Sequence, residues 1–247
     1  MAGEAGHQGP LDQFRIERYV EIDLGGFDAS FTNSAALMTA AVIITTALMV
    51  FGMRPRALIP GRLQSIAELS YEMIANMLGE TLGPEGRRYF PWIFSLFMFL
   101  LLGNTLGLIP YSFTFTSHIA VTFILAAVVF VAVIVIGLIR HRLKFFSLFL
   151  PPDVPLWLSP LLVPIEIVSF LARPISLSVR LFANMMAGHT MMHVFAGFVF
   201  SLGFLGFAPL AFIVALFGLE TIIAVLQAYV FTILTCLYLK DAIHLSH

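Results

Sequence analysis

The segment YFPWIFSLFMFLLLGNTLGLIPYSFTFTSHIAVTFILAAVVFVAVIVIGLI, residues 89–139, contains no Asp, Glu, Lys or Arg. A helix needs roughly 20 apolar residues to cross the hydrocarbon core of a bilayer, so this segment predicts two crossings joined by a turn near Pro110. A second uncharged stretch, residues 29–53, predicts one more crossing. Over the whole chain 60% of the residues are hydrophobic and 11% are charged, which excludes a soluble globular protein. The sequence therefore predicts an integral membrane protein.

The basic residues predict the side of the membrane that each loop faces. Three arginines follow the first crossing, Arg87 and Arg88 precede the second, and RHRLK at 140–144 follows the third. Cytoplasmic loops of membrane proteins carry an excess of Lys and Arg. The N-terminal tail has six acidic residues against two arginines, and it has no apolar segment of signal-peptide type. These patterns predict an N-terminus outside the membrane and a cytoplasmic C-terminus.

The predicted fold class is all-α, a single membrane domain with five crossings and one amphipathic helix. In residues 62–80, apolar side chains recur three and four residues apart with Glu68, Glu72 and Glu80 between them. This spacing predicts a helix on the cytoplasmic membrane surface, with packing against a soluble partner as the alternative. The predicted ranges are a polar tail at 1–29, crossings at 30–53, 88–109 and 117–139, the surface helix at 62–80, and two long helices at 160–200 and 207–240.

The last two helices are too long to stand upright in a bilayer. At 1.5 Å per residue the first is about 60 Å long, whereas the hydrocarbon core is about 30 Å thick. A helix of this length must lie strongly inclined, kink at Pro164 and Pro174, or extend out of the bilayer. We expect a strongly inclined hairpin.

Few polar side chains interrupt this hairpin. An ionisable side chain at membrane depth costs about 2.5 to 17 kcal/mol, so such residues mark ion pathways or tight internal pairs. At about 100° per residue, His189 and His193 point away from Arg180, whose own face carries small residues, while Glu220 and Gln227 share a face of the last helix. The candidate site residues are Glu166, Arg173, Arg180, Asn184, His189, His193, Glu220 and Gln227.

The residue types predict different roles within this set. An arginine does not lose its proton at physiological pH, so Arg180 can repel cations and attract a carboxylate but cannot relay a proton. Histidine and glutamate change protonation when they are desolvated or paired, so His189 and Glu220 can carry one. Arg173 lies near the end of its helix and could equally extend to the interface in a structural role.

Other interpretations of the same residues stay open at this point. Arg180 could form a structural ion pair with Glu220 or Glu166. His189 and His193, four residues apart, could hold a metal with Glu220 as a third ligand, as in a membrane metalloenzyme. A secondary transporter is a further alternative, although the sequence shows no internal repeat.

Two strings resemble subunit a of the F-type ATP synthases: ARPISLSVRLFANMMAGHTMMH at 172–193 and LETIIAVLQAYVFTILTCLYLKD at 219–241. The resemblance extends to PWIFSLFMFLLLGNTLGLIPYSF at 91–113 and to the basic loops, so it covers essentially everything after the N-terminal tail.

The resemblance implies roles for individual residues. Arg180 matches the essential arginine that faces a ring of subunit c, and Asn184 and Gln227 match polar residues near it. His189 and Glu220 match the pair that lines the half-channel from the outside. Some bacterial members carry an acid at the first of these two positions and a histidine at the second. The reversed order here is similar to the mitochondrial one and indicates an alphaproteobacterial or organellar source.

The implied function is that of a non-catalytic stator subunit that translocates protons and drives rotation of the subunit c ring. Two aqueous half-channels are implied, with Glu166 on the cytoplasmic one. The implied partners are the subunit c ring, the peripheral stalk subunit b, the remainder of the ATP synthase and the lipid bilayer, with no nucleic acid. The implied location is the bacterial inner membrane, with the mitochondrial inner membrane as the alternative. The chain has no GxxxxGK phosphate loop, and no cofactor or metal is implied.

Overall fold

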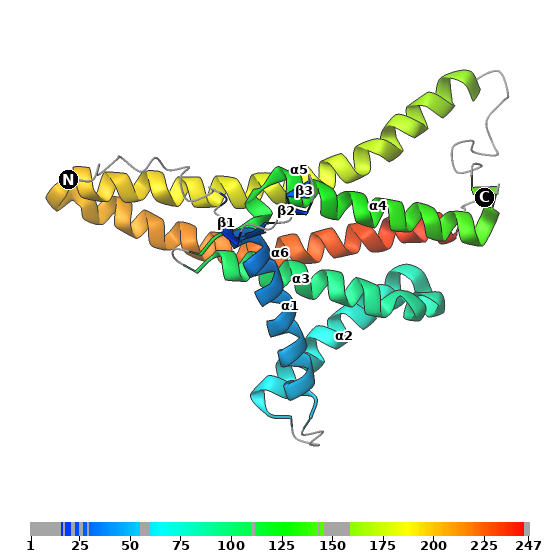
Figure 1. Cartoon of the computed structure of the whole chain (residues 1–247), viewed down its shortest axis with the longest axis horizontal. Helices are drawn as coiled ribbons and strands as arrows, with labels where there is room; N and C mark the ends of the chain where they lie inside the picture. The colour runs from blue at the N-terminus through cyan, green and yellow to red at the C-terminus, as the bar shows by residue number, and fades with distance from the viewer. Residues whose placement is uncertain are drawn as a thin grey trace.

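Two long helices run side by side, two shorter helices run along them, and the first helix lies across the bundle (Figure 1). In the computed structural model the described residues are 16, 18–20, 23–24, 27–28, 30–54, 60–109, 112–142, 144–145 and 159–244. Within them, five helices are long and apolar enough to cross a membrane, which confirms the predicted fold class. The predictions for Arg56, for the turn at Pro110 and for most of the tail concern residues outside the described ranges.

Short strands lie within the tail and directly before the first helix. β1 (Arg18–Val20) pairs antiparallel with β4 (Phe31–Thr32), and β2 (Asp23–Leu24) pairs antiparallel with β3 (Phe27–Asp28). These strands contain Tyr, Val, Phe and Thr, residue types that are favoured in strands. The all-α prediction did not include them.

The first helix, α1 (Asn33–Gly52), begins with a side-chain cap. The backbone N–H of Ala35 donates to Thr32 Oγ1 at 3.3 Å, which satisfies one of the unpaired donors at a helix start. Five of its apolar side chains, including Ile43 and Phe51, are exposed. Exposed apolar side chains around a helix of this length suit contact with lipid.

The predicted apolar face of α2 (Arg62–Leu82) is divided between two environments. Ile74, in its second half, is fully buried in the core, whereas Leu69 in its first half is 72% exposed. A 3-10 helix at Gly83–Tyr89, whose first residue has a φ of 65°, leads directly into α3 (Phe90–Gly107). The second half of α2 therefore belongs to the bundle, and the first half presents apolar side chains to its surroundings.

The outer turn, residues 112–117, connects α3 to α4 (Ile119–His141) and packs back against α3. A Cβ at Gly103 would overlap the ring of Phe115, and a Cβ at Gly107 would lie 2.5 Å from Thr114 Oγ1. Small residues four apart on a helix let another segment contact its backbone closely. These two glycines therefore leave the space in which the outer turn is seated.

The long hairpin consists of α5 (Ser159–Ser201) and α6 (Phe207–Ile243), joined by a 3-10 helix at Gly203–Gly206. α5 has 43 residues and stays helical through Pro164 and Pro174. Figure 1 shows α5 bending in its N-terminal third, so that this end diverges from α4 and α6. A bend is expected where proline removes a helix hydrogen bond. The inclination of the hairpin in a bilayer stays a prediction.

The central helix of the bundle is α6, which packs against α5, α3, α4 and α2. At one end His141 Nε2 donates to the carbonyl oxygen of Ile243 at 2.8 Å, and Arg140 pairs with Glu85 at 2.6 Å. These contacts join the C-terminal ends of α4 and α6 to the junction between α2 and α3. The basic segments that bracket the second and third predicted crossings therefore lie at the same end of the bundle.

Gly103→Ala should destabilise the protein, because the added methyl group would overlap the Phe115 ring. Overpacking of this kind costs about 1–3 kcal/mol. Gly79→Ala is the matched control, since this position is also helical and no atom lies within 4 Å of the added Cβ. Thermal unfolding in detergent should give a lower midpoint for Gly103→Ala than for Gly79→Ala. Equal midpoints would contradict the close seating of the outer turn.

Candidate functional site

Three polar contacts cross the seam between α5 and α6. They are Arg173 Nη1 to Asp241 Oδ2 at 2.7 Å, Asn184 Nδ2 to Gln227 Oε1 at 2.9 Å, and His189 Nδ1 to Glu220 Oε1 at 2.5 Å. On α6 the three partners are separated by 7 and 14 residues. Multiples of seven keep side chains on one side of a helix that packs along another. These three polar residues of α6 therefore face α5.

The apolar centre of this seam on α5 is formed by Leu177, Leu181 and Met185, which are fully buried. Asn184 and His189 lie on either side of this row. The helical phases placed Asn184 and His189 on different faces of α5. In the structure these two faces lie on either side of the same contact with α6, and both residues reach α6.

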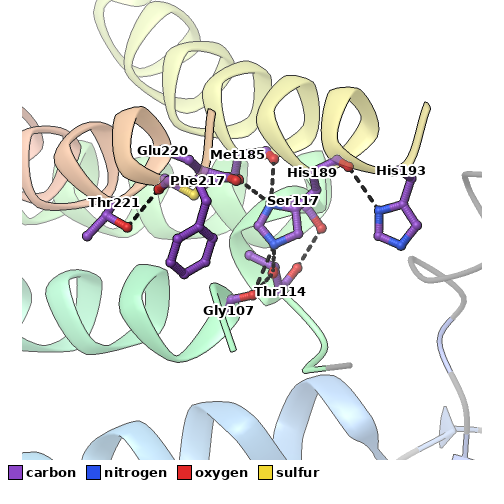
Figure 2. Close-up of polar contacts among 9 residues, drawn as sticks. All are labelled: Gly107, Thr114, Ser117, Met185, His189, His193, Phe217, Glu220 and Thr221. Carbon is purple, nitrogen blue, oxygen red and sulfur yellow. Dashed lines mark hydrogen bonds and ion pairs between the residues drawn. The ribbon is translucent and has the colours of Figure 1, made fainter. Parts of the chain in front are cut away.

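The most buried of these three contacts is the pair of His189 and Glu220 (Figure 2). The two residues are 6% and 3% exposed. Among the residues that the structure describes, Glu220 Oε2 has no hydrogen-bond partner, so His189 provides the compensation for the lost hydration of the carboxylate. Removing one member of a buried pair leaves the other charge uncompensated. A proton shared along the line between Nδ1 and Oε1 is the chemistry that this geometry supports.

The other edge of the His189 ring contacts the end of α3 and the outer turn. Nε2 lies 3.0 Å from the carbonyl oxygen of Gly107 and 2.9 Å from Thr114 Oγ1 (Figure 2). Thr114 Oγ1 is itself 3.1 Å from the same carbonyl oxygen. The histidine therefore joins α5, α6 and α3 at one point.

Amide side chains extend the polar seam on both sides of α6. Asn104 Nδ2, on α3, donates to the carbonyl oxygen of Ala224 at 3.1 Å, one turn from Glu220. Within the described part of the chain, Gln227 Nε2 and Asn104 Oδ1 are buried without a hydrogen-bond partner. Buried amide groups are normally paired, so these two atoms leave hydrogen-bonding capacity unused beside the seam.

Arg180 lies outside these contacts. Its side chain is exposed, and it makes no hydrogen bond or ion pair with any described residue. Ser176, Ala183 and Ala187 on the same face are exposed as well. The structural ion pair with Glu220 that the sequence left open is not formed, because the carboxylate is turned toward the opposite flank of α5.

Arg173 and Glu166 belong to the N-terminal part of α5. The Arg173 guanidinium pairs with Asp241 and lies 5.1 Å and 5.5 Å from the ring centroids of Tyr238 and Phe170. It therefore ties α5 to α6, a contact that the sequence did not predict; the extension of Arg173 to the interface stays a prediction. Glu166 is half-buried and has no ion pair with a described residue. It precedes the exposed arginine by 14 residues, on the order of 21 Å along a helix.

His193 is separate from the buried pair. Its side chain is exposed, its Nδ1 donates to the carbonyl oxygen of His189 at 3.0 Å, and its ring points away from Glu220 (Figure 2). Across the described ranges, no three His, Cys, Asp or Glu side chains lie close enough to hold a metal ion. The metal site of His189, His193 and Glu220 is therefore not formed, because the second imidazole lies one helical turn beyond the carboxylate.

The sequence interpretation missed two residues of this region, Thr114 and Asp241. Asp241 follows Tyr238 by three residues, so a helical spacing could have placed both on one side of α6. Thr114 contacts a histidine 75 positions away, and no local pattern predicts such a contact.

A buried pair of titratable side chains and an exposed arginine, all on membrane-length helices, define a multi-pass membrane protein suited to ion transfer. The model of the ATP synthase A chain family matches residues 35–240. The ATP synthase subunit a of Mesorhizobium japonicum is 55% identical over 245 residues, covering 96% of this chain and 97% of that protein. Those of Rhodospirillum rubrum and Pelagibacter ubique are 54% and 52% identical over 237 and 240 residues, each covering 96% of this chain and 98% of the relative.

The chain therefore belongs to the ATP synthase A chain family, the proton-translocating subunit a of the membrane-embedded Fo sector. This confirms the resemblance drawn from the two strings on α5 and α6. The named relatives are alphaproteobacterial, in agreement with the source that the order of histidine and glutamate indicated.

Gly188→Ala should impair transfer at the buried pair. A Cβ at Gly188 would lie 2.6 Å from Glu220 Oε1, so the carboxylate would have to move away from His189. A displacement of about 1 Å can lower a rate up to about a hundredfold. ATP-driven proton pumping should therefore fall at least about tenfold in membrane vesicles that hold the complete ATP synthase. Gly197→Ala on the same helix, with no atom within 4 Å of the new Cβ, should pump normally. Equal pumping by both variants would refute the importance of this contact.

Proposed function

We propose that this chain is the stator side of the Fo proton path. It provides two aqueous half-channels that Arg180 separates, and proton flow through them drives rotation of a ring of subunit c. The observation that carries the proposal is the exposed arginine, which has no counter-charge among the described residues of its own chain. A permanent cation at membrane depth requires an anionic partner. That partner has to come from another chain, and the resemblance implies a rotor carboxylate.

The face around Arg180 suits a moving helix. Its neighbours Ser176, Ala183 and Ala187 are small and exposed, and small side chains let two helices approach closely in a membrane. At 4 Å and an effective dielectric constant of about 20, a guanidinium and a carboxylate attract by about 4 kcal/mol. This attraction offsets part of the cost of moving an empty carboxylate past the stator without trapping it.

The same guanidinium blocks direct proton flow. It keeps its proton at any physiological pH, so it cannot pass one between the two half-channels. Each proton that crosses a potential of 100 mV releases about 2.3 kcal/mol. A proton that leaked past Arg180 would release this free energy without turning the rotor.

The outer half-channel contains the buried pair of His189 and Glu220. Gln227, two helical turns further along α6, accepts a hydrogen bond from Asn184 at 2.9 Å, and Asn184 lies one turn from the arginine. Polar side chains therefore follow the seam from the buried pair to the gate. Glu166, about 21 Å away on the other side of the gate, is assigned to the cytoplasmic half-channel.

The orientation follows from the charged ends of the bundle. The end that carries Arg87, Arg88 and Arg140 is proposed to be cytoplasmic, because basic residues favour that side. The N-terminus and the outer turn then lie on the opposite side of a bacterial inner membrane. The exposed apolar half of α2 is placed on the cytoplasmic surface, where subunit b of the peripheral stalk is a proposed neighbour. Nucleotide chemistry belongs to other subunits.

Arg180→Ala should abolish proton-driven ATP synthesis and open a passive proton leak, because the barrier between the half-channels is lost. Arg180→Lys should fail as well, since a buried ammonium can deprotonate and lacks the planar guanidinium. Both activities can be measured in membrane vesicles with the assembled enzyme. Arg87→Ala, an exposed arginine at the end of the bundle, is the control and should couple normally. Normal coupled synthesis by Arg180→Ala would rule out the proposed gate.

Cysteine crosslinking should locate the rotor. With the buried Cys236 replaced by Ala, Ala183→Cys should form disulfides with cysteines placed along the carboxylate-bearing helix of subunit c. Val128→Cys, exposed on α4, should not. Crosslinks from α4 instead of the arginine face would move the rotor contact to a different surface of this chain.

A further inference from the structure

The outer turn supplies a side chain that no proposed step of the proton path has yet used. Thr114 is only 1% exposed, and its Oγ1 lies 2.9 Å from His189 Nε2 and 3.1 Å from the carbonyl oxygen of Gly107. The same carbonyl oxygen is 3.0 Å from Nε2. These three atoms form a small triangle on the side of the imidazole opposite to Glu220 (Figure 2).

The chemistry of the triangle fixes the direction of its hydrogen bonds. A carbonyl oxygen can only accept, and a hydroxyl has a single proton to donate. If the Thr114 hydroxyl donated to Nε2, the lone pair of that nitrogen would also face the Gly107 oxygen at 3.0 Å, which is repulsive. The consistent arrangement has the hydroxyl donating to Gly107 while its oxygen accepts from Nε2–H. The Gly107 oxygen is then a second acceptor for the same N–H.

We propose that Thr114 is a positioning residue of the proton path, which together with the Gly107 carbonyl keeps a proton on His189 Nε2 and so leaves Nδ1 as the nitrogen that exchanges a proton with Glu220. This inference rests on the proposed role of the buried pair. It concerns how the ring is held, and it adds no new acid or base.

The exchange moves one proton between His189 and Glu220, and the pair holds the same number of protons in both of its states. In the first state Glu220 is a carboxylate and His189 carries protons on both nitrogens. In the second state the proton has crossed from Nδ1 to Oε1, over a separation of 2.5 Å, so that a neutral carboxyl group donates to a neutral imidazole. Nδ1 also lies 3.1 Å from the carbonyl oxygen of Met185, which can only accept, so this contact favours the first state. Nε2–H is unchanged in both states, and the ring does not need to rotate between them.

The position of Thr114 is itself fixed by the outer turn. The Ser117 hydroxyl donates to the Thr114 carbonyl oxygen at 2.5 Å. A Cβ at Gly107 would lie 2.5 Å from Thr114 Oγ1, so a larger residue there would push the hydroxyl away from the imidazole. The turn is thus built to hold this one hydroxyl against the ring.

Three variants in the complete ATP synthase test the inference. Thr114→Val keeps the shape of the side chain and removes the hydroxyl, Thr114→Ser keeps the hydroxyl, and Thr116→Val removes a buried hydroxyl of the same turn that has no hydrogen-bond partner among the described residues. ATP synthesis by vesicles is measured as the pH on the side of the outer turn is varied.

Thr114→Val should lower the maximal rate about tenfold, the order expected when one hydrogen bond to a charged group is lost, and should displace the pH profile. Thr114→Ser should keep at least about half of the rate, and Thr116→Val should match the parent. Parent-like rate and profile in Thr114→Val, or an equal loss in Thr116→Val, would overturn the assignment. Because Arg180→Ala is measured separately, a parent-like Thr114→Val beside an inactive Arg180→Ala would reject this inference and leave the proposed function intact.

The signals of 15N-labelled histidine test the protonation of His189 Nε2 directly, even if Thr114→Val fails to assemble. In the parent complex with 15N-labelled histidine, the His189 signals are identified as those missing from His189→Gln. Nε2 should stay protonated throughout a titration from about pH 5 to 9 while Nδ1 changes, which brackets the ordinary range of histidine. A deprotonated Nε2 at any point in this range would overturn the inference.

Discussion

The rest of the structure depends on one contact, in which the Glu220 carboxylate on α6 pairs with the His189 imidazole on α5. Hydrocarbon cannot solvate an ionised carboxylate, so the ionised form of Glu220 depends on His189 beside it. That requirement fixes the register of two helices of 43 and 37 residues. The same register brings Asn184 to Gln227 and Arg173 to Asp241, and the rest of the bundle packs around the resulting seam.

Some charged side chains of α5 and α6 pair with a side chain of opposite charge in the same chain, and others do not. Arg173 and Glu220 each have an oppositely charged or chargeable partner on the facing helix. Arg180, between them in sequence, has none among the described residues and lies on an exposed face. The Arg180 guanidinium therefore stays available to a partner other than the described residues of its own chain, as suits a subunit of the larger ATP synthase.

Much of the architecture was predictable, because a helix that crosses a membrane needs a long uncharged stretch that is visible in the sequence. Uncharged stretches of sufficient length predicted helices that are long and apolar enough to cross a membrane, and a rotation of 100° per residue correctly separated Arg180 from His189. The features that could not be predicted depend on which helices and turns contact one another. Ile74 and Leu69 look equivalent along α2, yet only the former meets the core. The contact of Thr114 with His189 forms because the outer turn packs back against Gly103 and Gly107 of α3. Helical periodicity cannot predict this packing.

The spacing of the polar residues on α6 determines which changes in length the helix tolerates. One residue inserted between Glu220 and Gln227 would rotate one of them by about 100° and shift it by about 1.5 Å relative to the other, so a partner on α5 would be lost. Seven inserted residues would nearly restore the rotation but move the two contacts apart by about 10 Å. The stretch from Glu220 to Asp241 therefore tolerates no insertion that would keep all three contacts with α5 in place.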